Sequence, residues 1–171
     1  MNIYFCGMIG SGKTTVGQRL AQQLQLQFYD LDQEMDRFLG YSFHELVQKE
    51  GWLAFRELEY SICKRFAKLD SAIICLGGGT VRYEWNMDVI AGSGLVILLT
   101  ASLEELIRRV KKADRPRVNV GTSVEEDIRM IWEKSRHKYF RAADIVYTTD
   151  QKSIDEEVQE LKKLISKYIP G

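Results

Sequence analysis

The chain has 171 residues, of which 45% are hydrophobic and 28% are charged. This length allows one well-buried core and is short for two domains, and the composition is ordinary for a soluble globular protein. Lysine plus arginine and aspartate plus glutamate both number 24, so the formal net charge is zero and a nucleic-acid partner held by bulk electrostatics is not expected.

No apolar stretch approaches the roughly 20 residues that a membrane-spanning helix needs, and the N-terminus lacks a basic region followed by a cleavable apolar segment. We therefore expect a cytoplasmic protein with no membrane partner. The cysteines Cys6, Cys63 and Cys75 form no CxxC pair, and we expect them to be apolar core residues. His44 and His137 lie far apart in the sequence, so a zinc site is not expected.

Short apolar runs alternate with longer stretches of helical periodicity along the chain. The predicted strands are Ile3–Cys6, Gln27–Tyr29, Ala72–Leu76, Leu95–Leu99 and Ile145–Tyr147. Short strands rich in β-branched residues and separated by helices are typical of βαβ units and a parallel sheet. The sequence shows no internal repeat and no linker, and we expect a single domain over residues 1–171.

Four helix starts carry the same signal, a serine followed three residues later by a glutamate. The pairs are Ser42 with Glu45, Ser102 with Glu105, Ser123 with Glu126, and Ser153 with Glu156. Such a serine caps an amide in the first turn, while the glutamate reaches back to the amide of the serine. After the last pair an apolar stripe predicts a core-facing helix, and its members are Ile154, Val158, Leu161, Ile165 and Tyr168.

Residues 7–14 (GMIGSGKT) match the phosphate-binding pattern G-x-x-x-x-G-K-[ST] between a predicted strand and a predicted helix. The glycines let several amides turn inward on a phosphate, and the helix adds its positive N-terminal end. In such a loop Lys13 supplies charge to the β- and γ-phosphates, and the Thr14 hydroxyl ligates Mg²⁺. The predicted residues of the ATP site are Gly10, Ser11, Gly12, Lys13, Thr14 and Thr15.

Two carboxylates, Asp30 and Asp32, follow the second predicted strand directly. As the chain leaves the strand, both can approach the phosphate site, where one can organise Mg²⁺ and the other can accept a hydrogen bond from a substrate hydroxyl. The alternative is that Asp32 caps the following helix.

Two further segments bear on the second substrate. Arg56 and Glu59 (FRxxE) share one face of a predicted helix, where an arginine fork suits a carboxylate or phosphate and a surface ion pair is the alternative. Residues 77–79 (GGG) follow the third predicted strand, at the end of a parallel strand where ligands approach the backbone. A flexible turn is the alternative there.

The least regular segment is residues 112–122 (KADRPRVNVGT), which we expect to be a mobile loop between two helices. Arg115 in this loop suits a lid that brings a charge to the γ-phosphate. Arg136 lies late in a predicted helix, where a cation also favours the helix dipole.

Taken in order, the motifs GMIGSGKT, DLD, FRxxE, LGGG, RP and Arg136 resemble the shikimate kinase family over nearly the whole chain. The resemblance implies an α/β three-layer P-loop fold, with a five-stranded parallel sheet in the order 2-3-1-4-5 flanked by helices. It also implies a substrate-binding segment at about residues 31–62 and a lid at 112–122. The implied activity is transfer of the γ-phosphoryl group of ATP to the 3-hydroxyl of shikimate, by a monomer that uses Mg²⁺.

The resemblance further implies a role for each site residue. Asp32 would bind the shikimate hydroxyls and act as base, and Arg56 and Arg136 would hold its carboxylate. The other implied contacts are Gly77, Gly78 and Gly79 to shikimate, Arg115 from the lid with Lys13 in catalysis, Asp30 at Mg²⁺, and Arg109 beside adenine.

The sequence departs from the family pattern at three places. Cys75 stands where a small hydroxyl residue near Mg²⁺ is usual, and Trp52 stands where polar residues are commoner. After Arg136 the stretch HKYF has one residue fewer before Ala143 than the family pattern, and a one-residue shift rotates a helical side chain by about 100°.

Two alternatives are compatible with the residues. A related kinase acting on a sugar acid such as gluconate, or on a nucleoside monophosphate, would use the same phosphate loop. The LGGG and FRxxE segments favour shikimate over these acceptors. A nucleotide-binding regulatory protein of the same fold is the alternative from another class, and Cys75 and the stretch after Arg136 are the features that favour it.

Overall fold

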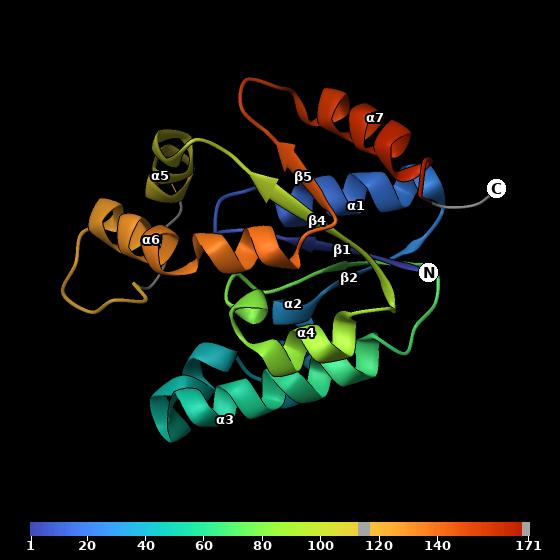
Figure 1. The fold of residues 1–171 in the computed structure, drawn as a ribbon. Coiled ribbons are helices and arrows are strands. Elements are labelled where there is room, and N and C mark those ends of the chain that lie inside the picture. The colour runs from blue at the N-terminus through green and yellow to red at the C-terminus, as the bar shows by residue number, and fades with distance from the viewer. Residues whose placement is uncertain (113–116, 169–171) are drawn as a thin grey trace.

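The computed structural model describes residues 1–112 and 117–168, and its strands form one parallel sheet (Figure 1). The strands are β1 (Asn2–Cys6), β2 (Gln27–Asp30), β3 (Ala72–Cys75), β4 (Gly94–Thr100) and β5 (Ile145–Thr148). Each predicted strand is confirmed to within one residue at either end. The order is β2-β3-β1-β4-β5, so the predicted order is confirmed as well.

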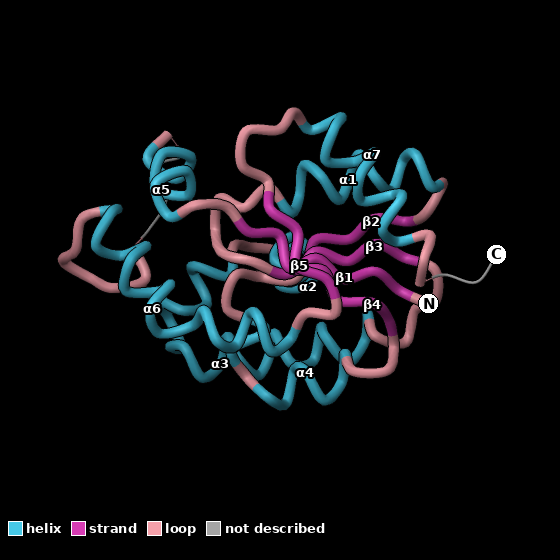
Figure 2. The backbone as a smooth tube through the Cα atoms, turned by 45° about the horizontal axis from the view of Figure 1, so that its top comes forward, coloured by secondary structure: helices cyan, strands magenta, loops and turns pink. Residues whose placement is uncertain are grey.

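Helices cover both faces of this sheet, which confirms the predicted three layers. The helices are α1 (Lys13–Leu24), α2 (Leu31–Leu39), α3 (Phe43–Phe66), α4 (Glu84–Ile90), α5 (Leu103–Lys111), α6 (Val124–Ala142) and α7 (Ile154–Ile165), with a short 3₁₀ helix η1 (Thr80–Arg82). Figures 1 and 2 show α1 and α7 on one face and α3, α4 and α6 on the other. None of the described helices is long and apolar enough to cross a membrane.

The core has two parts because successive side chains of a strand point to opposite faces of the sheet. In β1, Ile3 and Phe5 pack against α1 and α7, whereas Tyr4 and Cys6 pack against the helices of the other face. All three cysteines are free and buried, as predicted. The central strands β1, β3 and β4 are therefore largely apolar and buried, as expected of a covered parallel sheet, whereas the edge strands β2 and β5 are partly exposed.

This topology brings the functional loops to one edge. The phosphate loop follows β1, Asp30 ends β2, and residues 77–79 come soon after β3. Because β1, β2 and β3 are parallel neighbours, their carboxyl ends meet at the same edge of the sheet. The distant sequence motifs are thereby placed side by side.

The four predicted helix caps have three different outcomes. Ser123 and Ser153 form complete capping boxes with their glutamates. Ser102 caps the Glu105 amide, but the carboxylate of Asp150 accepts the hydrogen bond from the Ser102 amide in place of Glu105. At the fourth start, the side chain of Ser42 accepts from the amide of His44, not from that of Glu45.

Two members of the predicted C-terminal stripe are exposed. Val158, Leu161 and Ile165 are buried against α1 and the sheet, but Ile154 is 42% and Tyr168 is 50% exposed. Ile154 is the first residue of α7, and Tyr168 lies beyond its last residue. The prediction of core positions was wrong at both ends, since the helix ends before Tyr168 and its buried face does not extend to its first residue, Ile154.

Candidate active site

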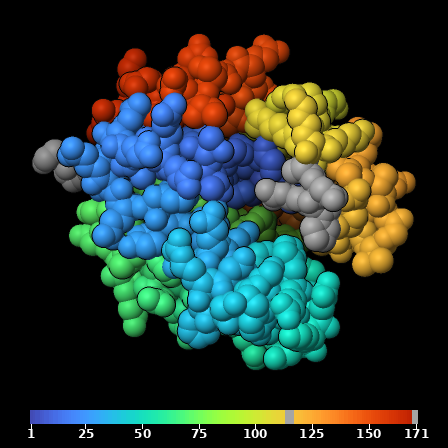
Figure 3. Space-filling view, turned by 180° about the vertical axis from the view of Figure 1, so that it is seen from behind, coloured from blue at the N-terminus to red at the C-terminus, as the bar shows by residue number. Residues whose placement is uncertain are grey.

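The candidate site lies at the carboxyl edge of β1, β2 and β3. Figure 3 shows the surface hollowed where the blue N-terminal part, the cyan α3 and the orange α6 approach one another. The glycine run 77–79 lies beside the phosphate loop, since a Cβ placed on Gly78 would be 3.8 Å from the Ile9 amide nitrogen.

The phosphate loop has the backbone that the motif predicts. Gly10 and Gly12 have positive φ angles of 82° and 90°, and a Cβ on Gly7 would overlap the carbonyl oxygen of Leu99. Gly12 precedes the first turn of α1 and has no side chain to cap it, so the amides at this helix start are open to an anion. Glycine is required at these positions because other residues would be strained or would clash.

Lys13 is held over this loop. Its Nζ donates to the carbonyl oxygens of Gly7 at 2.8 Å and Met8 at 3.1 Å. Burial lowers the pKa of Lys13, while the nearby carboxylate of Asp32 opposes this shift. A phosphate in the loop would give the ammonium group a stronger partner than the two carbonyls.

Two other predicted ATP contacts flank the lysine. The Ser11 hydroxyl is buried without a hydrogen-bond partner among the described residues, and Thr15 is exposed at the start of α1. A buried hydroxyl without a partner is costly unless a ligand or water satisfies it. The Ser11 hydroxyl is therefore suited to bind a polar group in the loop.

Thr14 and Asp30 form a pair of oxygen ligands. The Thr14 hydroxyl donates to Asp30 Oδ2 at 2.7 Å. The other oxygen of Asp30 accepts from the amides of Asp32 and Gln33, so Asp30 is the residue that caps α2. The alternative that Asp32 caps this helix is therefore wrong. A hydroxyl and a carboxylate oxygen are hard ligands of the kind that Mg²⁺ prefers, and the pair fits that ion.

Because Asp30 caps the helix, the side chain of Asp32 is available to the site. A Cβ placed on Gly77 would lie only 2.7 Å from Asp32 Oδ1. Burial and the neighbouring Asp30 raise the pKa of Asp32 to about 6, and Lys13 partly opposes the shift. Asp32 is thus a carboxylate whose proton affinity is closer to neutral pH than usual, which suits a general base.

Arg56 is oriented by a buried carboxylate. Its Nη1 donates to Glu59 Oε1 at 2.8 Å, and the side chains of Arg56 and Glu59 are only 12% and 1% exposed. Glu59 also accepts from Thr80 at 2.9 Å and from Asn86 at 3.0 Å. The alternative of a surface ion pair is therefore wrong. A buried pair with these extra hydrogen bonds holds the guanidinium in one place.

Aromatic rings complete the surroundings of this guanidinium. Its carbon lies 4.5 Å from the ring centre of Tyr83, 4.8 Å from that of Phe55 and 5.6 Å from that of Trp52. Cations are attracted to such ring faces. The unusual Trp52 thus contributes to the placement of Arg56 although it is 49% exposed.

The backbone of the glycine run is fixed by contacts with neighbouring elements. A Cβ on Gly79 would lie 3.0 Å from Arg56 Nη2, just as one on Gly77 would meet Asp32. Tyr139 of α6 donates a hydrogen bond to the Gly78 carbonyl oxygen, and Thr80 continues into η1. Glycine is required at Gly77 and Gly79 because side chains there would displace the groups that line the site, and the alternative of a flexible turn is not supported.

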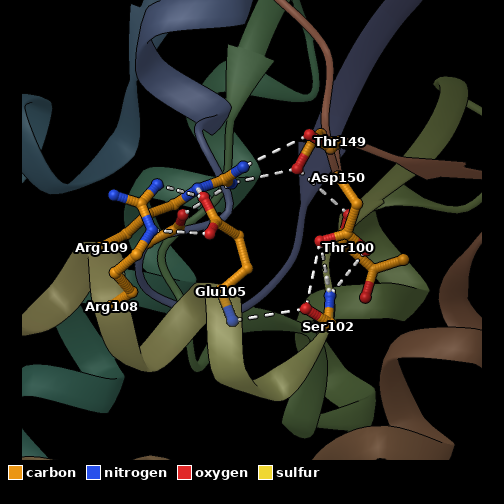
Figure 4. Close-up of polar contacts among 8 residues, drawn as sticks. Thr100, Ser102, Glu105, Arg108, Arg109, Thr149 and Asp150 are labelled. Carbon is orange, nitrogen blue, oxygen red and sulfur yellow. Dashed lines mark hydrogen bonds and ion pairs between the residues drawn. The ribbon is translucent and has the colours of Figure 1, made fainter.

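Arg109 ties three segments together beside the phosphate loop (Figure 4). It donates to the Gly10 carbonyl oxygen at 3.2 Å, to the Thr149 hydroxyl at 3.0 Å and to Glu105 at 2.8 Å. Its helix α5 also packs against Gly10, where a Cβ would lie 2.9 Å from the Val110 side chain. The structure therefore places Arg109 at the phosphate loop, and its position beside adenine stays a prediction.

Two predicted site residues, Arg136 and Arg115, and the unusual Cys75 remain to be placed. Arg136 is exposed on α6, and Arg115 lies outside the described residues. Cys75 is buried, and its thiol donates to the Lys13 carbonyl oxygen at 3.1 Å. Burial raises the pKa of Cys75, so it is a neutral thiol that packs under the phosphate loop.

Several contributing residues were not predicted from the sequence. Thr80, Asn86 and Tyr139 support the site through contacts between distant parts of the chain. The stretch that contains Tyr139 departs from the family pattern, but nothing in the sequence indicates its contact with Gly78.

Comparisons with known proteins agree with this geometry. The family model for Shikimate kinase matches residues 9–166. A shikimate kinase of Chlorobium luteolum is 36% identical over 98% of this chain and 86% of its own length. One from Coxiella burnetii is 34% identical over 87% of this chain and 84% of its own.

Solved structures show the same relationship. A shikimate kinase of Acinetobacter baumannii in complex with shikimate has a TM-score of 0.91 and 27% identity, covering 99% of this chain and 95% of that one. The shikimate kinase of Aquifex aeolicus has a TM-score of 0.83 and 28% identity, with both chains fully covered. The fold, the phosphate loop and these matches together place the chain in the shikimate kinase family, a family of phosphotransferases that use ATP as co-substrate.

Proposed function

We propose that this protein transfers the γ-phosphoryl group of ATP to the 3-hydroxyl of shikimate, giving ADP and shikimate 3-phosphate. The observation that carries the proposal is the glycine run with a carboxylate at one end and a guanidinium at the other. Asp32 Oδ1 lies 2.7 Å from the Cβ position of Gly77, and Arg56 Nη2 lies 3.0 Å from that of Gly79. An acceptor with hydroxyls and a carboxylate suits this pair, and shikimate has both.

The chemistry asked of the side chains is mostly positioning. Arg56 already has one nitrogen on Glu59, and its second nitrogen faces Gly79, where it can bind the acceptor carboxylate. This contact would orient the ring so that the reacting hydroxyl lies at Asp32. Asp32 accepts the hydroxyl proton as the oxygen bonds to the γ-phosphorus and the bond to the β-phosphate oxygen breaks.

Charge on the transferred group is balanced by the loop. Lys13 moves from the carbonyls of Gly7 and Met8 to the phosphates, and Arg115 of the lid adds a second cation when the lid closes. Thr14 and Asp30 would hold Mg²⁺ through their oxygen atoms. When bound, this ion neutralises charge on the β- and γ-phosphates.

The remaining predicted roles belong to the same proposal. Residues 31–62 bind the acceptor, residues 112–122 form the lid, and Arg109 lies beside adenine. Arg136 joins the carboxylate site from α6 once the acceptor is bound. The zero net charge supports an enzyme without a nucleic-acid partner, and we propose that it is cytoplasmic and acts as a monomer.

The test is a coupled ADP-release assay with ATP and Mg²⁺ over a panel of shikimate, gluconate and nucleoside monophosphates. We expect release with shikimate alone. Release with gluconate in preference to shikimate would show a sugar-acid kinase. If none of the acceptors gave ADP release although the protein bound nucleotide, a regulatory protein of the same fold would be supported and the proposal would be refuted. Asp32→Ala, which should bind ATP without turnover, is the matched control.

A further inference from the structure

A second arginine lies at Gly79, in addition to Arg56. Arg82 is the last residue of η1, and a Cβ placed on Gly79 would be 2.7 Å from its Nη2 and 3.0 Å from Nη2 of Arg56. In Figure 1 the short η1 lies between α6 and α3, so two elements from different parts of the chain bring their guanidinium groups to one glycine. Two guanidinium groups this close repel each other, so the arrangement is costly unless an opposite charge compensates it.

The charges around Gly79 do not balance. Arg56 is paired with Glu59, whose two oxygens already accept from Arg56, Thr80 and Asn86. Among the described residues no carboxylate lies within ion-pair distance of Arg82, and its buried Nε has no hydrogen-bond partner. Two guanidinium groups against one carboxylate leave a net positive charge at Gly79, while the carboxylate of Asp32 lies at the other end of the run, against Gly77. An anion bound here would balance this charge.

The backbone around Arg82 is fixed by other contacts. Lys138 of α6 donates to the Arg82 carbonyl oxygen at 2.6 Å, and the Arg82 amide donates to the Gly79 carbonyl oxygen at 3.0 Å. The guanidinium is thus presented from a rigid turn instead of from a mobile loop. Ordering a long side chain costs free energy on binding, and a fixed backbone reduces that cost.

We propose that Arg82 binds the carboxylate of the acceptor together with Arg56, because the two guanidinium groups meet at the same Cβ position of Gly79. This inference rests on the proposed function, because it takes the acceptor to be a hydroxylated carboxylic acid. Arg82 is thereby a substrate-binding residue, and the acid recognised is the same one that Asp32 activates through a hydroxyl.

The experiment compares Arg82→Met with the wild-type enzyme on shikimate and on shikimate methyl ester, which lacks the negative charge. With shikimate we expect KM to rise roughly 10- to 100-fold in the variant, as for the loss of a charged hydrogen bond, while KM for ATP is unchanged. With the ester, the variant and the wild type should have the same kcat/KM. Arg82→Lys, which keeps the charge without the fork, should lie between the two.

The matched control is Arg141→Met. Arg141 is on α6, its side chain is 83% exposed, and it contacts only the exposed Glu84 among the described residues. The control removes the same charge and should leave both substrates unaffected. A folding defect in Arg82→Met would lower activity on shikimate and ester equally, so the ratio of the two activities remains informative.

The inference is overturned if Arg82→Met retains the wild-type KM for shikimate, or if it loses activity equally on acid and ester. Failure of the proposed function would look different, because the wild-type enzyme itself would then not phosphorylate shikimate.

Discussion

Replacing Asp32 by asparagine should remove activity and at the same time stabilise the fold. Asparagine has the same shape and can still accept a hydrogen bond, but it can neither take a proton nor carry charge. The loss of a general base of this kind typically costs 10²- to 10⁴-fold, and we expect about that decrease in kcat. ATP binding should survive, because Lys13 and the loop amides are untouched.

The stability effect follows from the pKa of Asp32. Its pKa is about 6 in the folded protein, against an ordinary value of 3.8. The fold therefore favours the protonated acid, and the stabilising contribution of Asp32 is full below pH 3.8 and lost as the pH rises through 6. A tenfold change in proton affinity corresponds to about 1.4 kcal/mol, which gives an upper limit of about 3 kcal/mol at pH 8. Since the side chain is only partly buried, about 1–3 kcal/mol is expected.

The assay is urea unfolding of the wild type and Asp32→Asn at pH 4 and pH 8. The variant should be more stable at pH 8 by about 1–3 kcal/mol, and the difference should fall to about 0.5 kcal/mol at pH 4, where Asp32 is neutral in the folded protein and about half ionised in the unfolded chain. For the wild-type enzyme, kcat/KM should fall as the pH drops below about 6, when Asp32 takes up its proton. A variant that is less stable than the wild type at pH 8 would contradict the raised pKa, and one that keeps wild-type turnover would show that Asp32 is not the base.

Three further substitutions test the rest of the site. Arg56→Lys removes the fork that is shared between Glu59 and the acceptor, and kcat/KM for shikimate should fall about 100-fold with little change in KM for ATP. Gly79→Ala places a methyl group 2.7–3.1 Å from two guanidinium groups. Steady-state kinetics should then show a higher KM for shikimate and an unchanged KM for ATP. Arg109→Ala breaks the contacts to Gly10, Thr149 and Glu105, and both the ATP affinity and Tm should fall; an unchanged Tm would show that this network is not needed for stability.

The sequence was most informative where function and local structure use the same residues. The phosphate loop was predicted in full because glycine positions and the following helix are read directly from neighbouring residues. The strands were confirmed because buried strands of a parallel sheet appear in the sequence as short, nearly continuous apolar runs. The spacing of Arg56 and Glu59 predicted their pairing, although not that the pair is buried.

Prediction failed where a contact joins distant segments. Nothing near Asp30 indicates that it, and not Asp32, caps α2, since both follow the strand and both are good caps. The Ser102 amide donates its hydrogen bond to Asp150 instead of Glu105, and this contact joins residues 48 apart in the chain. Likewise, only the packing of α6 against η1 brings Tyr139 to Gly78 and Lys138 to Arg82. Such contacts depend on how the layers pack, which periodicity does not specify.

Phosphorylation of the 3-hydroxyl of shikimate is tested most directly by the structure of the product. The purified protein would be incubated with ATP, Mg²⁺ and shikimate, and the product examined by proton and phosphorus NMR. We expect a single phosphate ester, with phosphorus coupling to the proton on carbon 3, and no such product from Asp32→Asn. A phosphate on another hydroxyl, or unchanged shikimate beside an active sugar-acid reaction, would contradict the proposed function.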